Sequence, residues 1–162
     1  MQGSADEWFE ECYAEHADSI FRFAYAKVSD REVALDLAQE SFMRLWDQVR
    51  DGAAMEHPRA FLFTVVRNLV IDHYRKKKTA SLDAMVEDGR EFAGNAASPE
   101  TDAAYHEALG AILALEEPYR DVVYLRYVEE IPPREVAEVL GESVNAVSIR
   151  ITRGMKKLRE TL

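Results

Sequence analysis

The chain has 162 residues, of which 48% are hydrophobic, so its composition excludes a disordered protein and suits one ordinary domain or two small ones. Its net charge of −10 argues against nucleic-acid binding by the body as a whole, because phosphate binding needs basic surface. No apolar run approaches the ~20 residues of a membrane span, the N-terminus lacks a secretory pattern and Cys12 is the single cysteine, which together predict a cytoplasmic protein without a disulfide.

Helical periodicity runs through most of the chain, whereas strand alternation and hairpin dipeptides are almost absent. The periodicity predicts helices at residues 6–28, 30–50, 58–78, 99–115, 118–128, 133–140 and 144–160. Ser29 and Glu32 have the spacing of a capping box at the start of the second helix, and Pro58 suits the first position of the third.

A stretch without helical periodicity separates two helical blocks. Residues 79–98 are rich in Ala, Gly and acidic side chains and hold few large apolar ones, which predicts a flexible, acidic linker. The predicted fold is therefore all-α, with two small helical domains at residues 1–78 and 99–162 and a helix-turn-helix in the second. Domains of this size have marginally stable cores, so we expect both to gain stability from a partner.

The second predicted helix has two faces of different character. One face is an ordinary core stripe, formed by Ala34, Leu35, Ala38, Phe42, Leu45 and Val49. The opposite face combines carboxylates, an amide and large apolar side chains, namely Asp36, Gln39, Glu40, Met43, Trp46 and Asp47. A plain solvated face would be polar throughout, so the Met and Trp on this surface need another explanation.

The third predicted helix also carries a polar face beside its core stripe. The stripe is formed by Leu62, Val65, Val66 and Leu69. The polar face leads into the basic residues 76–78 and is formed by Thr64, Asn68, Asp72 and Arg75. Such a face could follow a nucleic-acid strand, since the Asn68 amide both donates and accepts hydrogen bonds. The pattern alone nevertheless favours a solvated amphipathic helix with an Asp72–Lys76 pair.

The most specific local signal is "PPREVAEVLGESVNAVSIRITRGMKKLRE", which predicts a helix-turn-helix. Gly141 permits a tight turn after the first helix, and Ser143 can cap the second. The buried stripe of that second helix is formed by Val144, Val147, Ile151 and Leu158. A polar, basic face points outward, formed by Asn145, Ser148, Ile149, Thr152, Arg153 and Lys156, with Arg150 and Lys157 on its flank. This face suits the major groove of DNA, although two packed helices with a solvated basic face remain an alternative.

Signals for catalysis or metal binding are weak. Cys12 and His16 are four residues apart and could form half of a metal site, but no second pair accompanies them. The chain has no Gly-rich phosphate loop and no nucleophile elbow. We therefore expect no enzymatic activity, no metal and no cofactor.

In their order and spacing these segments resemble the extracytoplasmic function (ECF) sigma factors, small two-domain members of the sigma-70 family of bacterial RNA polymerase. The segment "LDLAQESF" is similar to the family's polymerase-clamp-binding segment, where a D-x-x-Q-E pattern is carried here by Asp36, Gln39 and Glu40. The segment "AFLFTVVRNLVIDHYRKKK" resembles the part that recognises the −10 promoter element; its R-N-x-x-I-D-x-x-R pattern is carried by Arg67, Asn68, Ile71, Asp72 and Arg75. Residues 115–158 resemble the domain that recognises the −35 element.

The resemblance implies a non-enzymatic sigma factor that binds core RNA polymerase through the β′ clamp and the β flap and directs it to promoter DNA. The polymerase-binding residues would be Asp36, Gln39, Glu40, Met43, Trp46 and Asp47, a mixed face that suits an interface. The −10 element would be recognised by Phe61, Thr64, Arg67, Asn68, Asp72, Arg75, Lys76 and Lys77. The −35 element would be recognised by Asn145, Ser148, Ile149, Arg150, Thr152, Arg153, Lys156 and Lys157.

The resemblance also implies that residues 1–78 are sigma region 2, that residues 99–162 are region 4 and that an anti-sigma factor covers the same faces. The acidic linker at residues 79–98 would thread through the polymerase. Two rival hypotheses remain open: an autonomous helix-turn-helix regulator that binds duplex DNA without polymerase, and an adaptor that binds polymerase or a sigma partner without supporting transcription. A metal-dependent enzyme is the weakest alternative.

Overall fold

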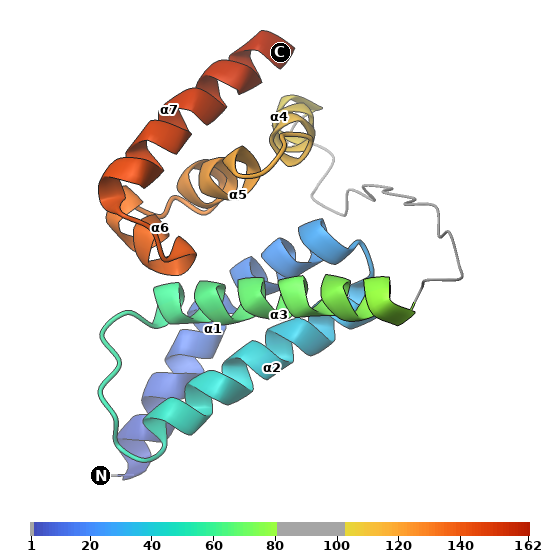
Figure 1. The fold of residues 1–162 in the computed structure, drawn as a ribbon. Helices are drawn as coiled ribbons and strands as arrows, with labels where there is room; N and C mark the ends of the chain where they lie inside the picture. Colours follow the sequence, from blue (N-terminus) through green and yellow to red (C-terminus); the bar gives the residue numbers. More distant parts are fainter. Residues whose placement is uncertain (1, 81–102) are drawn as a thin grey trace. The chain divides into compact units, whose positions relative to one another are not determined.

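A computed structural model describes residues 2–80 and 103–162, and these residues are almost entirely helical, with no strand among them (Figure 1). This confirms the predicted all-α fold. The chain divides into two compact units, one within residues 1–91 and one within residues 92–162, and each is described here by itself. Most of the predicted linker and the start of the fourth predicted helix lie outside the described residues.

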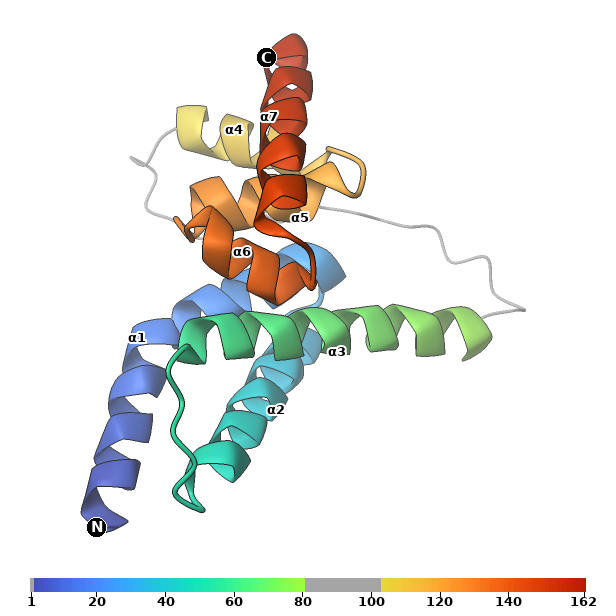
Figure 2. The same cartoon turned by 60° about the vertical axis from the view of Figure 1, so that its left-hand side comes forward.

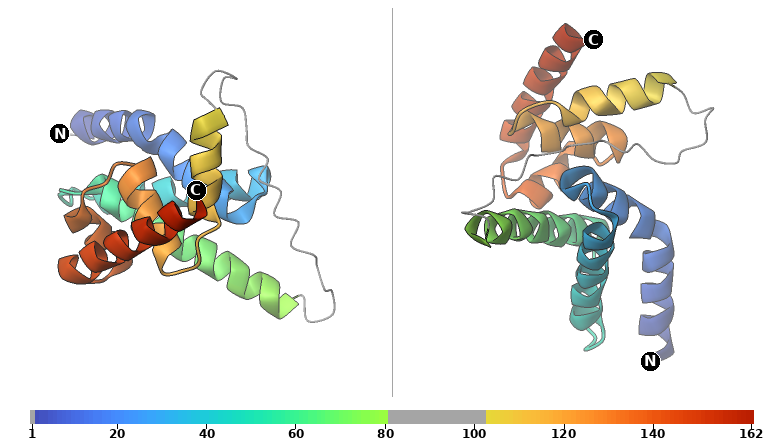
Figure 3. Two further views of the ribbon diagram at one scale, coloured as in Figure 1. Left: turned by 90° about the horizontal axis from the view of Figure 1, so that it is seen from above. Right: turned by 90° about the vertical axis from the view of Figure 1, so that its right-hand side faces the viewer.

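The first unit consists of three helices, α1 (Gln2–Val28), α2 (Arg31–Val49) and α3 (Pro58–Ala80), each of which packs against the other two. The first half of α1 lies beside α2, and α3 crosses the pair (Figures 2 and 3). The core is formed by large side chains with almost no exposed surface, including Ile20, Phe23, Leu45, Leu62, Phe63 and Val66. The rings of Phe23 and Phe63 meet edge to face at 5.7 Å, which ties α1 to α3.

The capping box predicted for α2 is wrong by one residue. Asp30 is the N-cap, and its carboxylate accepts hydrogen bonds from the backbone N–H groups of Glu32 at 3.0 Å and Val33 at 3.2 Å. Ser29 instead lies in the left-handed region with φ of 55°, where it ends the turn from α1. The prediction that α3 begins at Pro58 is confirmed.

The core stripes of α2 and α3 differ slightly from the predicted ones. Leu35 is 39% exposed, so its assignment to the core is wrong, and Ser41 is fully buried with its hydroxyl donating to the Leu37 carbonyl at 2.9 Å. The buried line of α2 therefore runs through Ala34, Ala38, Ser41, Phe42, Leu45 and Val49. In α3, Leu69 is only half-buried, while Phe63 and Val70 join the core.

The second unit contains α4 (Ala103–Leu113), α5 (Tyr119–Val123), the π-helical turn η1 (Tyr124–Val128), α6 (Pro133–Leu140) and α7 (Val144–Thr161). The sequence predicted one regular helix where α5 and η1 lie. The Tyr124 hydroxyl, at the start of η1, donates to the carboxylate of Glu129, the residue that follows η1, at 3.0 Å. None of the described helices is both long and apolar enough to span a membrane.

The predicted helix-turn-helix is formed by α6 and α7. Gly141 ends α6 in the left-handed conformation with φ of 66°, and the Ser143 hydroxyl accepts a hydrogen bond from the Ala146 N–H at 3.1 Å, so both predicted roles are confirmed. Val144 is 46% exposed and does not join the buried stripe, because it is the first residue of α7 and lies ahead of the packed turns. Val147, Ile151 and Leu158 are buried as expected.

A close approach of α7 to α5 occurs at Gly154, which is buried. A Cβ atom at this position would lie 2.6 Å from Cγ2 of Val123 and 3.4 Å from Cβ of Tyr119. Val123 is itself fully buried, and its β-branched side chain has little rotamer freedom. Glycine is therefore required at residue 154 for α7 to lie at this distance from α5.

We expect Gly154→Ala to destabilise the second unit, because the added methyl group has no space beside Val123. Overpacking of this kind costs about 1–3 kcal/mol, which exceeds the roughly 1 kcal/mol that Ala gains over Gly in a helix. Differential scanning calorimetry of the full chain measures the change in unfolding temperature.

The matched control is Gly110→Ala in α4, where an added Cβ meets no atom within 4 Å. This variant should unfold at the same temperature as the wild type or at a higher one. A Gly154→Ala protein as stable as the Gly110→Ala protein would contradict the close contact between α5 and α7.

Candidate functional site

The structure places the six predicted polymerase-binding residues on the surface of α2. Asp36, Gln39 and Asp47 are exposed, and Met43 is 62% exposed, while Glu40 and Trp46 are half-buried. Burial of the opposite stripe against α1 and α3 orients α2 in this way. We call this set of six residues the α2 outer face.

Two ion pairs along the helix hold acidic groups of the α2 outer face. Arg44 donates to the Glu40 carboxylate at 3.1 Å, and the Arg50 guanidinium lies 3.5 Å from the Asp47 carboxylate. Both pairs are exposed to solvent, so they add little stability. Asp36 and Gln39 lie one turn apart beside them, so the face offers mostly acceptor groups to a partner.

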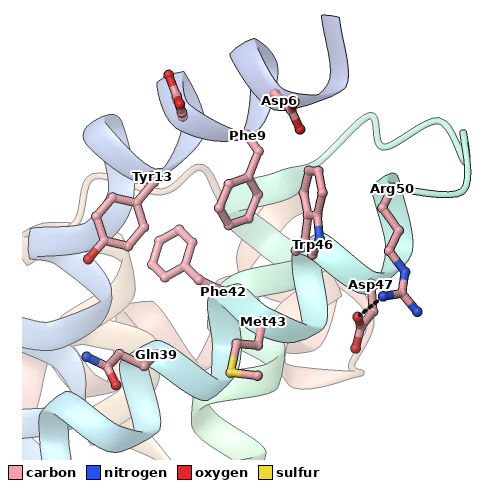
Figure 4. A pocket seen from close by; sticks show the side chains of 10 residues that line it. Asp6, Phe9, Tyr13, Gln39, Phe42, Met43, Trp46, Asp47 and Arg50 are labelled. Atoms are coloured by element: carbon pink, nitrogen blue, oxygen red, sulfur yellow. Dashed lines mark ion pairs between the residues drawn. The ribbon is translucent and has the colours of Figure 1, made fainter. Parts of the chain in front are cut away.

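A pocket between α1 and α2 adjoins the α2 outer face, and the sequence did not predict it. Phe9 of α1 extends toward α2 between Phe42 and Trp46, with ring centroids 6.3 Å and 5.3 Å away (Figure 4). Tyr13 lies 4.8 Å from the Phe42 ring. The pocket has a volume of about 710 Å³ and is lined by Asp6, Phe9, Glu10, Tyr13, Gln39, Phe42, Met43, Trp46, Asp47 and Arg50. The spacing of Phe9 and Tyr13 on α1 was the available signal, since residues four apart share a helix face.

The predicted −10 residues lie along α3. Phe61, Thr64 and Arg67 are half-buried, and the remaining five are exposed, namely Asn68, Asp72, Arg75, Lys76 and Lys77. The Thr64 hydroxyl donates to the Ala60 carbonyl at 2.8 Å, within its own helix. The Asp72 carboxylate lies 3.8 Å from the Arg75 guanidinium, whereas the sequence suggested Lys76 as its partner. The exposed Asn68 and the following basic residues form one polar surface that ends in positive charge.

The predicted −35 residues lie on α7, and two of them form ion pairs with carboxylates of the same unit. Arg150 donates to the Glu142 carboxylate at 3.2 Å, which links α7 to the turn before it. The Lys157 ammonium lies 3.7 Å from the Glu116 carboxylate and 5.3 Å from the centre of the Tyr119 ring. The other six residues are exposed, namely Asn145, Ser148, Ile149, Thr152, Arg153 and Lys156.

The half metal site suggested by Cys12 and His16 has no metal-binding environment around it. Cys12 is buried in α1, and burial, reinforced by the Glu15 carboxylate, raises the pKa of its thiol to about 11. A thiol with this pKa stays protonated near neutral pH and is therefore a poor nucleophile. Within residues 2–80 and 103–162, no three His, Cys, Asp or Glu side chains are grouped closely enough to hold a metal ion.

Two family models match the two helical units. The model for Sigma-70 region 2 matches residues 12–80, and the model for Sigma-70, region 4 matches residues 105–158. The chain is 30% identical to the ECF RNA polymerase sigma factor SigW of Bacillus subtilis, over 91% of this chain and 84% of that protein. It is 28% identical to the RNA polymerase sigma factor SigV of the same organism, over 91% and 87%.

Solved structures with the same fold include the sigma factor RpoE of Bartonella quintana in complex with the anti-sigma factor NepR, with a TM-score of 0.77 at 21% identity over 94% of both chains. CnrH in complex with the cytosolic domain of CnrY gives a TM-score of 0.64 at 26% identity, over 96% of this chain and 88% of that one. These structures share the fold, while the two family models and the 30% identity to SigW over most of both chains show that the chain belongs to the ECF sigma factors of the sigma-70 family.

Proposed function

We propose that the two helical units of this sigma factor carry three exposed faces, each of which binds a different partner during transcription initiation. The α2 outer face binds core RNA polymerase, the polar surface of α3 recognises the −10 element, and α7 recognises the −35 element. The observation that supports this division is chemical: the α2 face mixes acids with Met and Trp, whereas α3 and α7 present polar and basic groups. Residues 1–78 then act as region 2, residues 79–98 as the linker and residues 99–162 as region 4.

The α2 outer face has the anatomy of a protein interface. Met43 and the half-buried Trp46 supply large apolar contacts, while Asp36, Gln39 and Asp47 surround them with polar groups. Interfaces commonly combine an apolar centre with a polar rim, and aromatic residues contribute strongly to their affinity. The similar curated proteins are named RNA polymerase sigma factors, and the resemblance assigns this face to the coiled coil of the β′ clamp.

The α3 surface suits a nucleic-acid strand that runs along the helix from Asn68 toward the basic residues at the C-terminal end of α3. Asn68 is exposed and can pair with a base edge, and Lys76 and Lys77 are exposed near the end of α3, where they can neutralise phosphates. The resemblance assigns this surface to the −10 element. A pair of aromatic side chains in this part of α3 could wedge the duplex open, but this chain has Val65 and Val66 there. Opening of the duplex would therefore rely on capture of a flipped base by Asn68 and the loop at residues 50–59.

The outward side of α7 suits the major groove. Asn145 and Ser148 offer hydrogen-bonding groups, and the 43% exposed Ile149 can contact a thymine methyl group. Arg153 and Lys156 are exposed cations farther along the helix, in position to contact phosphates. Arg150 and Lys157 must give up or share their acidic partners to do the same, so we expect them to contribute less to DNA affinity.

Other aspects of the function follow from these faces. The body of the protein is acidic, which limits DNA binding before polymerase is bound, and chemical catalysis then belongs to the polymerase. RpoE was solved with the anti-sigma factor NepR, and we propose that an anti-sigma factor covers the same faces in this chain. The β flap is the expected partner of the second unit, and the cytoplasm, where transcription takes place, is the expected compartment.

Asp36→Ala/Gln39→Ala/Met43→Ala should bind core RNA polymerase at least tenfold more weakly than the wild type, because it removes three exposed side chains from the proposed interface. Glu32→Ala/Gln48→Ala removes two exposed α2 side chains outside that face and should bind normally. Size-exclusion co-elution followed by a binding titration measures both. Normal binding by the triple variant would refute the docking face, and a wild type that stays free would favour an autonomous regulator.

Lys156→Ala and Lys157→Ala test which cations of α7 contact DNA. Loss of one phosphate contact lowers the slope of log affinity against log salt by about 1. We expect this change for Lys156→Ala and a smaller one for Lys157→Ala, whose side chain is held by Glu116 and Tyr119. Promoter binding by the reconstituted holoenzyme at several salt concentrations measures the slopes, and an equal or larger change for Lys157→Ala would contradict the assignment.

A further inference from the structure

We propose that Glu116 and Glu142 are specificity-determining residues, because they pair with two cations of α7 and so lower the affinity of the second unit for DNA of unrelated sequence. This inference rests on the proposed role of α7 in recognition of the −35 element and deepens it by assigning two residues outside that helix. The observation that carries it is a pair of contacts: Arg150 lies 3.2 Å from the Glu142 carboxylate, and Lys157 lies 3.7 Å from the Glu116 carboxylate.

The two paired cations lie on one flank of α7. Arg150 and Lys157 are separated by two helical turns, so they lie only about 20° apart around the helix axis. Their carboxylate partners come from two different segments, the turn between α6 and α7 and the loop between α4 and α5. Both cations of this flank are therefore neutralised by carboxylates of the protein itself.

Other exposed cations of α7 have no such partner. Arg153 and Lys156 form no ion pair within the part of the chain that the structure describes. An unpaired cation attracts any duplex, since the phosphates are the same in every sequence. A cation already paired with a carboxylate gains less from a phosphate, which must displace the carboxylate or lie beside its negative charge. The ion pairs thus reduce the number of α7 cations that bind DNA without regard to sequence.

The pairing weakens the two kinds of DNA complex to different degrees. A complex with unrelated DNA depends almost entirely on phosphate contacts, so every neutralised cation lowers its affinity. A complex with the −35 element also has the proposed base contacts of Asn145 and Ser148, which hold α7 in one register on the duplex. Because that register does not depend on Arg150 or Lys157, both ion pairs can remain formed and the promoter complex loses little. The two carboxylates thereby raise the ratio of specific to nonspecific affinity.

The exposure of the ion pairs suits a role in binding rather than in folding. The side chains of Arg150 and Glu142 are 29% and 38% exposed, and those of Lys157 and Glu116 are 44% and 72% exposed. Ion pairs this open to solvent contribute little to the free energy of unfolding. Loss of the two carboxylates should therefore change DNA affinity while the second unit stays folded.

Glu116→Gln/Glu142→Gln removes both negative charges and keeps the size of the side chains. The free full-length variant should bind a duplex of unrelated sequence roughly tenfold more tightly than the wild type in low salt, with a slope of log affinity against log salt that is steeper by about 2, because two more cations release counterions. Fluorescence anisotropy titrations at several salt concentrations measure both quantities. A variant that binds no more tightly than the wild type would overturn the proposal, whereas partial unfolding could not produce the expected gain.

The matched control is Glu107→Gln/Glu138→Gln, which removes two exposed carboxylates of the second unit that form no ion pair with any described residue. The change in net charge is the same, so this control separates pairing from the charge of the whole protein. Its affinity for the unrelated duplex should stay within about twofold of the wild type. An equal gain for the two double variants would assign the effect to net charge and contradict the role of the ion pairs.

A second background separates pairing from direct repulsion of phosphates by the carboxylates. In Arg150→Gln/Lys157→Gln, the carboxylates have no cations to neutralise. Adding Glu116→Gln/Glu142→Gln to this background should therefore leave the affinity for unrelated DNA within about twofold, as expected for residues that act through each other. A gain as large as in the wild-type background would refute the pairing mechanism.

Promoter selection by the reconstituted holoenzyme tests the consequence for specificity. With a promoter found by run-off transcription, roughly fivefold less unrelated duplex should displace half of the Glu116→Gln/Glu142→Gln holoenzyme than of the wild type. Equal gains in promoter and unrelated affinity would overturn this inference and leave the proposed function standing. Asn145→Ala/Ser148→Ala should lose selectivity in the same assay; if it selects the promoter as the wild type does, α7 does not recognise the −35 element and both proposals fail.

Discussion

Burial of one stripe on each functional helix determines what the same helix presents to a partner. Ala34 and Leu45 of α2 and Val66 of α3 have no exposed surface, so neither helix can rotate without exposing its core. With those stripes fixed, the acidic and apolar residues of α2 and the polar residues of α3 must lie outside. Rotation of either helix by a single residue would mix core and interface positions, so the chemistry of the surface depends on the packing beneath it.

In the second unit, packing also fixes the orientation of the helix that carries the proposed contacts. Here the close packing depends on a glycine rather than on large buried side chains. Gly154 lets α7 approach Val123, and the cap at Ser143 determines where α7 begins. These two features fix the direction and the register of the helix that carries the proposed −35 residues. Glu142 and Glu116 then pair with Arg150 and Lys157, which leaves Arg153 and Lys156 as the unpaired, exposed cations among the proposed −35 residues.

Periodicity predicted the helices and most of their faces because burial repeats every 3.6 residues. The errors lie where local pattern does not carry the information. Leu35 is one residue from the true stripe, and Val144 lies in a first turn that no neighbour covers. The N-cap of α2 is whichever of Ser29 and Asp30 has the extended backbone that a cap requires, and the periodicity of the sequence does not reveal that this is Asp30.

Contacts between distant residues could not be predicted in the same way. Lys157 pairs with Glu116, and Phe9 packs against Trp46, in each case across more than 30 residues of chain.

As a sigma factor, this chain is expected to give core RNA polymerase its promoter specificity. Run-off transcription with core enzyme on fragments of genomic DNA, with and without the chain, tests it most directly. The account predicts new start sites that follow two shared sequence elements at a fixed spacing; no new starts, or starts without shared elements, would contradict it.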